Sequence, residues 1–217
     1  MVVGTAARWA IAACGLVALV GAGVAAWAQS VVSGWARRPS TVDADVADRI
    51  DSLTLLTSLL EVAALLLAAV LLMTWLFQLY GSDRVVPAEL HHSRSWTIWG
   101  WLVPVLAIWR PLQVVRDLWW ALAPPADRLR PGLSRPVPVL MRWWWGTWLA
   151  MSALGSVDAQ VSNRATTLAQ LRDSYSVTIL SELMTAIAAV VAVVFFTRLA
   201  SRARPAGSNG VGFTQPR

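Results

Sequence analysis

The sequence predicts an all-α membrane protein with four transmembrane helices and one proline-broken helical segment between them. Of its 217 residues, 57% are hydrophobic and 14% are charged, whereas soluble proteins have about 25% charged residues. The hydrophobic residues are gathered into runs that approach or exceed the roughly 20 residues needed to cross a bilayer. We expect one multi-pass domain over residues 1–204 and a disordered cytoplasmic tail over 205–217.

The expected spans cover residues 9–32, 53–80, 143–157 and 177–199. The first has a rival interpretation as a secretory signal peptide, because Ala26-Trp27-Ala28 resembles a cleavage site. Its apolar run before that point has 18 residues, more than the usual 7–15 of a signal core, which favours a retained span. Ala18, Ala22 and Ala26 recur every four residues, a spacing that lets a neighbouring helix approach closely.

The second span is expected to continue into water at its start. Ser40 or Thr41 is the predicted N-cap, with Asp43 and Asp45 in the first helical turn, where acidic side chains complement the helix dipole.

The segment 96–122 opens as a membrane helix and is then interrupted by Pro104 and Arg110-Pro111. Its apolar part, 96–109, has 14 residues, about 21 Å as a helix, which is short of the roughly 30 Å bilayer core. Each proline removes an N–H and kinks a helix. The segment is therefore either re-entrant or one kinked full span, and the latter gives five transmembrane helices. After Pro111 an apolar stripe leaves Arg116 and Asp117 off it, which is typical of an interfacial helix.

Two tryptophan-rich stretches, the first of which also contains prolines, carry a family resemblance. They are Trp99-Gly100-Trp101-Leu102-Val103-Pro104, continued by Arg110-Pro111 and by 114–119, and the tryptophan-rich start of the next span, 143–148. The chain resembles an actinobacterial membrane family catalogued as domain-of-unknown-function family 4328, although Ala107 stands where many members have Asn. The resemblance implies a multi-pass helical fold with Trp99, Gly100, Trp101, Pro104 and Pro111 as its structural motif, and it implies no activity.

Arginine distribution predicts the orientation. There is no Lys, and with four spans 13 of the 18 arginines lie on the side of the termini and the proline-rich loop. Five spans give the same division, so the positive-inside rule places that loop and the C-terminus in the cytoplasm under either arrangement. Most tryptophans lie toward that side in the four-span arrangement, which favours it. The expected location is the bacterial plasma membrane.

Glu61 and Glu182 are candidate functional residues, because an ionisable group inside a span is costly unless it is paired. With four spans both lie in the outer half of the membrane and are able to share a polar pocket, whereas five spans separate them. Arg110, Arg116 and Asp117 are the further candidates. His91 and His92 lack the spacing of a zinc site, and we assign no catalytic, cofactor-binding or metal residue.

The leading functional hypothesis is a non-enzymatic accessory, scaffolding or regulatory membrane component, because no catalytic or phosphate-binding motif is present. The alternative is a small transporter or channel subunit that uses the two glutamates. A third class is a lipid-acting enzyme in which Arg110 and Arg116 hold a headgroup. The expected partners are the bilayer and a membrane protein or a second copy, with no nucleic acid and no cofactor.

Overall fold

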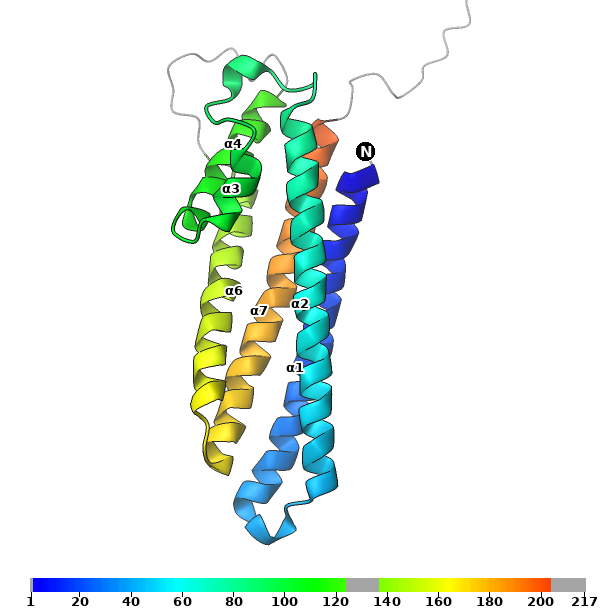
Figure 1. Ribbon diagram of the computed structural model, residues 1–217, viewed down its shortest axis with the longest axis vertical. Helices are drawn as coiled ribbons and strands as arrows, with labels where there is room; N and C mark the ends of the chain where they lie inside the picture. The colour runs from blue at the N-terminus through cyan, green and yellow to red at the C-terminus, as the bar shows by residue number, and fades with distance from the viewer. Residues whose placement is uncertain (1, 124–136, 204–217) are drawn as a thin grey trace, which may run out of the picture.

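The structure is a computed structural model that describes residues 2–123 and 137–203. In this part of the chain every regular element is helical. Four long helices lie side by side, and two short ones gather at one end (Figure 1). The bounds of the α-helices are α1 Val2–Arg37, α2 Ala44–Tyr80, α3 Trp96–Leu102, α4 Arg110–Ala121, α6 Val139–Arg164 and α7 Leu168–Arg202, and those of the 3-10 turns are η1 Pro39–Thr41, η2 Pro87–Glu89 and η3 Leu106–Ile108. The predicted tail, 205–217, lies outside the described residues.

Helices α2 and α7 begin before the apolar runs, at residues whose side chains cap them. Asp43 is the N-cap of α2, and its carboxylate accepts a hydrogen bond from the Val46 amide at 3.2 Å. The prediction of Ser40 or Thr41 as the cap is therefore wrong, since Thr41 belongs to η1. Thr167 caps α7 by accepting from the Gln170 amide at 3.2 Å. Asp and Thr suit these positions because their oxygens satisfy amides that a helix start leaves free.

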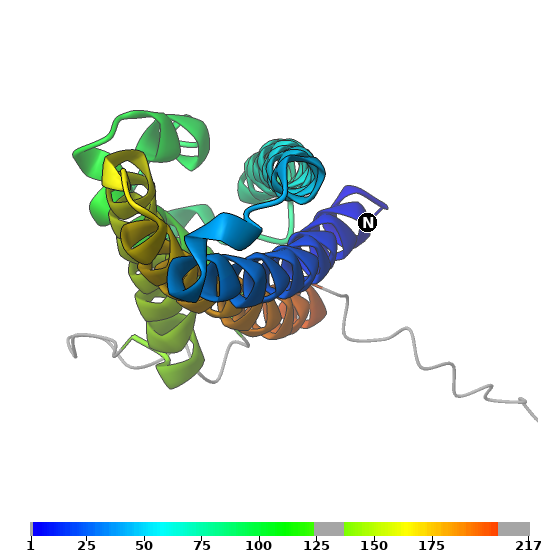
Figure 2. The ribbon, with the colours of Figure 1, turned by 90° about the horizontal axis from the view of Figure 1, so that it is seen from below.

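The long helices pack in the order α2, α1, α7, α6. Helix α1 contacts both α2 and α7, and α6 packs against α7; Figure 2 shows α1 crossing between α2 on one side and α7 on the other. Small side chains allow the close approach: Ala18 and Ala22 are buried, and a Cβ at Gly15 would lie 2.9 Å from the Cβ of Ala189. Ala26 is exposed, because a four-residue repeat drifts around a helix of 3.6 residues per turn.

Tryptophan and phenylalanine side chains form the main core at the end that holds α3 and α4. The Trp144 ring stacks on Phe195 at 5.0 Å and meets Phe196 edge-on at 5.1 Å. Trp119 of α4 also stacks on Phe195, at 5.8 Å. Trp101 of α3 lies 5.7 Å from Trp148 of α6. These contacts fasten the short helices to α6 and α7, and each aromatic pair contributes about 0.5–1.5 kcal/mol beyond area burial.

Within the part of the chain that the structure describes, three helices are long and apolar enough to cross a membrane, namely α1, α2 and α7. In α2 only 6% of the most apolar stretch is buried within the chain, and Leu55, Leu59 and Leu66 are each about 60% exposed. Such a surface is unfavourable in water and suited to lipid. These helices indicate a membrane protein. The expected span 143–157 lies within α6, which has sufficient length but is not among the three.

The segment 96–122 is not one continuous helix. Helix α3 ends at Leu102, and Val103 is extended because it precedes Pro104. Pro111 occupies the first turn of α4, where its missing N–H costs no hydrogen bond. Figure 1 shows α3, η3 and α4 doubled back at the end where α2 finishes and α6 begins, whereas the kinked full span of the five-helix alternative would run the length of the bundle.

The turn between α3 and α4 presents apolar side chains to the exterior. Leu102, Val105 and Ile108 are each more than half exposed, and Trp109 is 41% exposed. The tip of the doubled-back segment therefore has an apolar surface. Helix α6 then runs from this end to the far end, and α7 returns beside it (Figure 1).

We predict that Trp144→Ala lowers the free energy of unfolding by about 3–5 kcal/mol, as for other large-to-small core substitutions. The reason is that Trp144 is 2% exposed and contacts both phenylalanines. Trp143→Ala is the matched control, since Trp143 itself is 64% exposed and a surface change costs about 0.5 kcal/mol or less. Thermal unfolding of the purified chain in detergent measures both, and equal shifts would contradict the assignment of this cluster as the core.

Candidate functional site

The two glutamates predicted from the apolar runs meet between α2 and α7. The carboxyl groups of Glu61 and Glu182 lie within hydrogen-bonding reach of each other. Gly21 of α1 forms the adjoining wall, because a Cβ there would lie 3.0 Å from Cδ and Oε1 of Glu182. Any larger residue at position 21 would push the Glu182 side chain away. The two groups therefore lie at the same level of the bundle.

A hydrogen bond between two carboxyl groups requires a proton on one of them, since ionised carboxylates only accept. The Glu182 Oε2 atom is shielded from solvent and receives no hydrogen bond from an amide, guanidinium or hydroxyl donor. A proton held within the pair is therefore the donor available to it. In an apolar setting this arrangement removes one negative charge and satisfies one oxygen, which lowers the cost of placing two carboxyl groups together.

A third carboxylate adjoins the pair from α6. Asp158 accepts a hydrogen bond from Thr178 Oγ1 of α7 at 2.7 Å, and it is close enough for its charge to act on both glutamates. The sequence analysis did not single out Asp158, because it lies just beyond the predicted span 143–157. The hydrogen bond to Thr178 ties α6 to α7 at this level. The charge of Asp158 on α6 thus acts on the pair formed between α2 and α7.

Asp117 occupies a different site. Its predicted place off the apolar stripe of α4 does not leave it at the surface, because the residue is buried, at 3% exposure. The loop between α2 and α3 folds over it. Its Oδ2 accepts from the His91 amide at 3.1 Å and lies 2.7 Å from His92 Nδ1. Tyr80 then donates to the His92 carbonyl at 2.6 Å. This carboxylate holds the loop onto α4, which is a structural role.

Arg110 and Arg116 do not join either carboxyl group. Arg110 Nη1 donates to Gln113 at 3.2 Å, and its guanidinium lies 4.8 Å from the Trp96 ring centre. A Cβ at Gly100 would lie 3.3 Å from the Cβ of Arg110, so the glycine of the Trp-Gly-Trp motif allows α3 to pack closely on α4. Arg116 is half-buried, and neither arginine has a carboxylate partner within the described ranges.

The remaining motif residues serve the same doubled-back segment. Trp101 packs among the tryptophans of α6, Trp99 is 57% exposed, and Pro104 and Pro111 mark the breaks already described. Over residues 2–123 and 137–203, no group of three or more His, Cys, Asp or Glu side chains is placed to hold a metal ion. The motif is thus a packing device around the segment 96–122.

We predict that Asp117→Asn detaches the loop over residues 81–95 from α4. Hydrogen bonds to a charged group are worth about 1.5–3 kcal/mol each, so the loop should open at least about tenfold more often. Limited trypsin digestion of the purified chain measures cleavage after Arg84 and Arg94. Asp83→Asn, an exposed position in the same loop, is the control, and equal cleavage rates in the two variants would exclude the proposed role of Asp117.

Comparison with known proteins identifies a family to which the sequence of this chain is similar. Residues 38–201 match the family described as domain of unknown function (DUF4328), a range that includes Glu61, Asp117, Asp158 and Glu182 and begins just after α1. No curated protein and no solved structure matches the chain. Because the match covers well over half of the residues, the chain belongs to the DUF4328 family, whose domain has no known function.

Proposed function

We propose that this protein is a non-enzymatic, multi-pass component of the bacterial plasma membrane that acts as an accessory, scaffolding or regulatory subunit. Four crossings are proposed, by α1, α2, α6 and α7, with the segment 96–122 re-entrant from the cytoplasmic side. Support for the topology comes from α6, which connects the end that holds α4 to the start of α7, itself apolar enough to cross. If α2 and α7 cross, α6 must cross between them.

Arginine placement supports a cytoplasmic C-terminus. Those at the end that holds α3 and α4 are Arg8, Arg84, Arg94, Arg110, Arg116, Arg142, Arg198 and Arg202. Those toward the far end are Arg37, Arg38, Arg49, Arg164 and Arg172. The positive-inside rule assigns the first group to the cytoplasm, and with it the end of α7.

The observation that carries the accessory role is the polar face of α6. Ser152, Ser156 and Gln160 recur every four residues, so they share a face, and all three are exposed within the chain. Their side chains bond to carbonyls of their own helix, at 2.9, 2.9 and 3.2 Å. A crossing helix with small polar residues outward suits a neighbouring helix better than acyl chains. We propose that a helix of a partner membrane protein covers this face.

Spin labelling in native membranes tests the proposal. In a Cys14→Ser background we would attach a nitroxide at Ser156→Cys, and at Leu59→Cys as the control, since Leu59 is 60% exposed on α2. We expect the label at 156 to be protected from oxygen dissolved in the lipid and the label at 59 to be accessible. Protection that disappears after purification and dilute reconstitution indicates a partner protein. Protection that returns at high density indicates a second copy, and equal accessibility at both positions would refute the covered face.

A second candidate function is a small proton or cation transporter subunit, and the meeting of Glu61 and Glu182 favours it. A proton held between two carboxyl groups inside a membrane is able to move if water reaches the pair. Under the accessory role the pair is structural, and the chain in liposomes should pass protons no faster than protein-free vesicles.

Glutamate-to-glutamine substitutions distinguish the two functions. Glu182→Gln retains a donor for Glu61 without needing the shared proton, so we expect folding yield to be kept. If wild-type liposomes acidify under an imposed membrane potential and those with Glu182→Gln or Glu61→Gln do not, the transporter function holds. Absence of flux in all three samples, with folded protein confirmed by thermal unfolding, supports the accessory role.

A further inference from the structure

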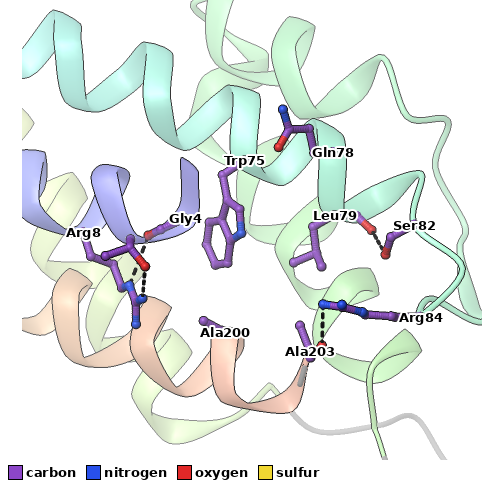
Figure 3. A pocket seen from close by; sticks show the side chains of 10 residues that line it. Gly4, Arg8, Trp75, Gln78, Leu79, Ser82, Arg84, Ala200 and Ala203 are labelled. Atoms are coloured by element: carbon purple, nitrogen blue, oxygen red, sulfur yellow. Dashed lines mark hydrogen bonds between the residues drawn. The ribbon is translucent and has the colours of Figure 1, made fainter. Parts of the chain in front are cut away.

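A pocket outside the carboxyl site opens at the end of the bundle that holds α3 and α4. It has a volume of about 220 Å³ and lies between the first turns of α1 and the last turns of α2 and α7 (Figure 3). Three helices that are each apolar enough to cross a membrane converge there. The pocket therefore lies where the apolar stretches of these helices end, at the level at which lipid headgroups are found.

Two arginines enter this pocket from opposite sides (Figure 3). Arg8 donates to the Gly4 carbonyl at 3.1 Å and to the hydroxyls of Thr5 and Thr197 at 3.1 and 3.4 Å. Arg84 donates to the Ala203 carbonyl at 3.0 Å through Nη1. All these acceptors are neutral, and the described residues that line the pocket include no acidic side chain. Within the described residues, the hydrogen bonds of the two guanidinium groups thus go to neutral acceptors and not to a carboxylate.

The remaining lining combines polar groups with a rigid wall. Gln78 and Ser82 of the α2 end supply an amide and a hydroxyl. Trp75 is buried at 8% exposure and is held against α1, because a Cβ at Gly4 would lie only 2.5 Å from its Nε1. A guanidinium offers five N–H donors in a planar fork that matches phosphate oxygens, and the bonds of Arg84 leave most of its donors available. The set of groups suits a compact oxyanion.

We propose that this pocket binds a phosphate-bearing anion, held between Arg8 and Arg84 with Gln78 and Ser82 as further hydrogen-bonding groups. The chemistry is that of an anionic phosphate ester, supplied either by the headgroup of an anionic phospholipid in the adjacent leaflet or by a free phosphate compound. Basic pockets between transmembrane helices bind such headgroups. A zwitterionic phosphocholine headgroup fits poorly, because its quaternary ammonium adds a third positive charge to the site. Neither the proposed partner face on α6 nor the glutamate pair is required for this binding.

The test uses the full chain in micelles, with dioctanoyl phosphatidylglycerol, dioctanoyl phosphatidylcholine and inorganic phosphate as separate probes. Native mass spectrometry measures bound probe, and the midpoint of thermal unfolding is followed as each is titrated. Arg84→Gln removes one charge at an exposed position, and Ala200→Phe fills the pocket while leaving both arginines in place. Arg164→Gln is the control, because it removes the same charge from an exposed site at the far end.

We expect saturable binding of phosphatidylglycerol, with affinity about tenfold weaker in Arg84→Gln and in Ala200→Phe and unchanged in Arg164→Gln. Tight binding of phosphatidylglycerol with weak binding of inorganic phosphate identifies the lipid as the source, and comparable binding of both identifies a free phosphate compound. Equal retention of phosphatidylcholine and phosphatidylglycerol would overturn the proposal. So would affinity that is the same in Ala200→Phe as in the wild type.

Discussion

A helix broken by proline in an apolar environment must find partners for the backbone groups that the break releases, because no water is there to bond them. In this chain the break between α3 and α4 falls beside the tryptophan-rich start of α6. Trp145 donates its indole N–H to the Ile108 carbonyl at 3.2 Å, and Trp101 reaches back from α3 to the same group of rings. The tryptophans therefore supply both the hydrogen bond and the apolar cover that the interrupted segment requires.

The same end of the bundle is fixed by polar contacts that cross between elements. Asp117 holds the loop after α2. Arg94 donates to the Phe77 carbonyl at 2.8 Å while lying 3.7 Å from the Phe77 ring centre. Charged groups thus cap helix ends rather than pair on an open surface. The adjacent pocket at this end contains Arg8 and Arg84, whose hydrogen bonds among the described residues go to neutral acceptors.

Away from that end the packing is looser and depends on small residues. Between Ile50 and Ala68 no residue of α2 is buried, yet Glu61 lies in this stretch and contacts Glu182. Gly21 creates the space for that contact. The glutamine variants therefore alter a polar contact in a region of α2 where the chain buries few side chains.

The sequence by itself determined the helical membrane class, the two glutamates inside apolar runs and the prolines at which segment 96–122 breaks. A carboxylate in an apolar run and a proline in a helix have costs that do not depend on neighbours, so Glu61, Glu182, Pro104 and Pro111 stand out without a structure. Burial of Asp117, the approach of Asp158 and the shared pocket of Arg8 and Arg84 were decided only by the tertiary structure. Each of these contacts joins segments that are far apart in the chain. The local sequence pattern does not predict which distant segments meet at one level of the bundle. For the polar face of α6, the sequence determines the four-residue spacing. The tertiary structure determines the exposure, because another face of α6 packs against α7.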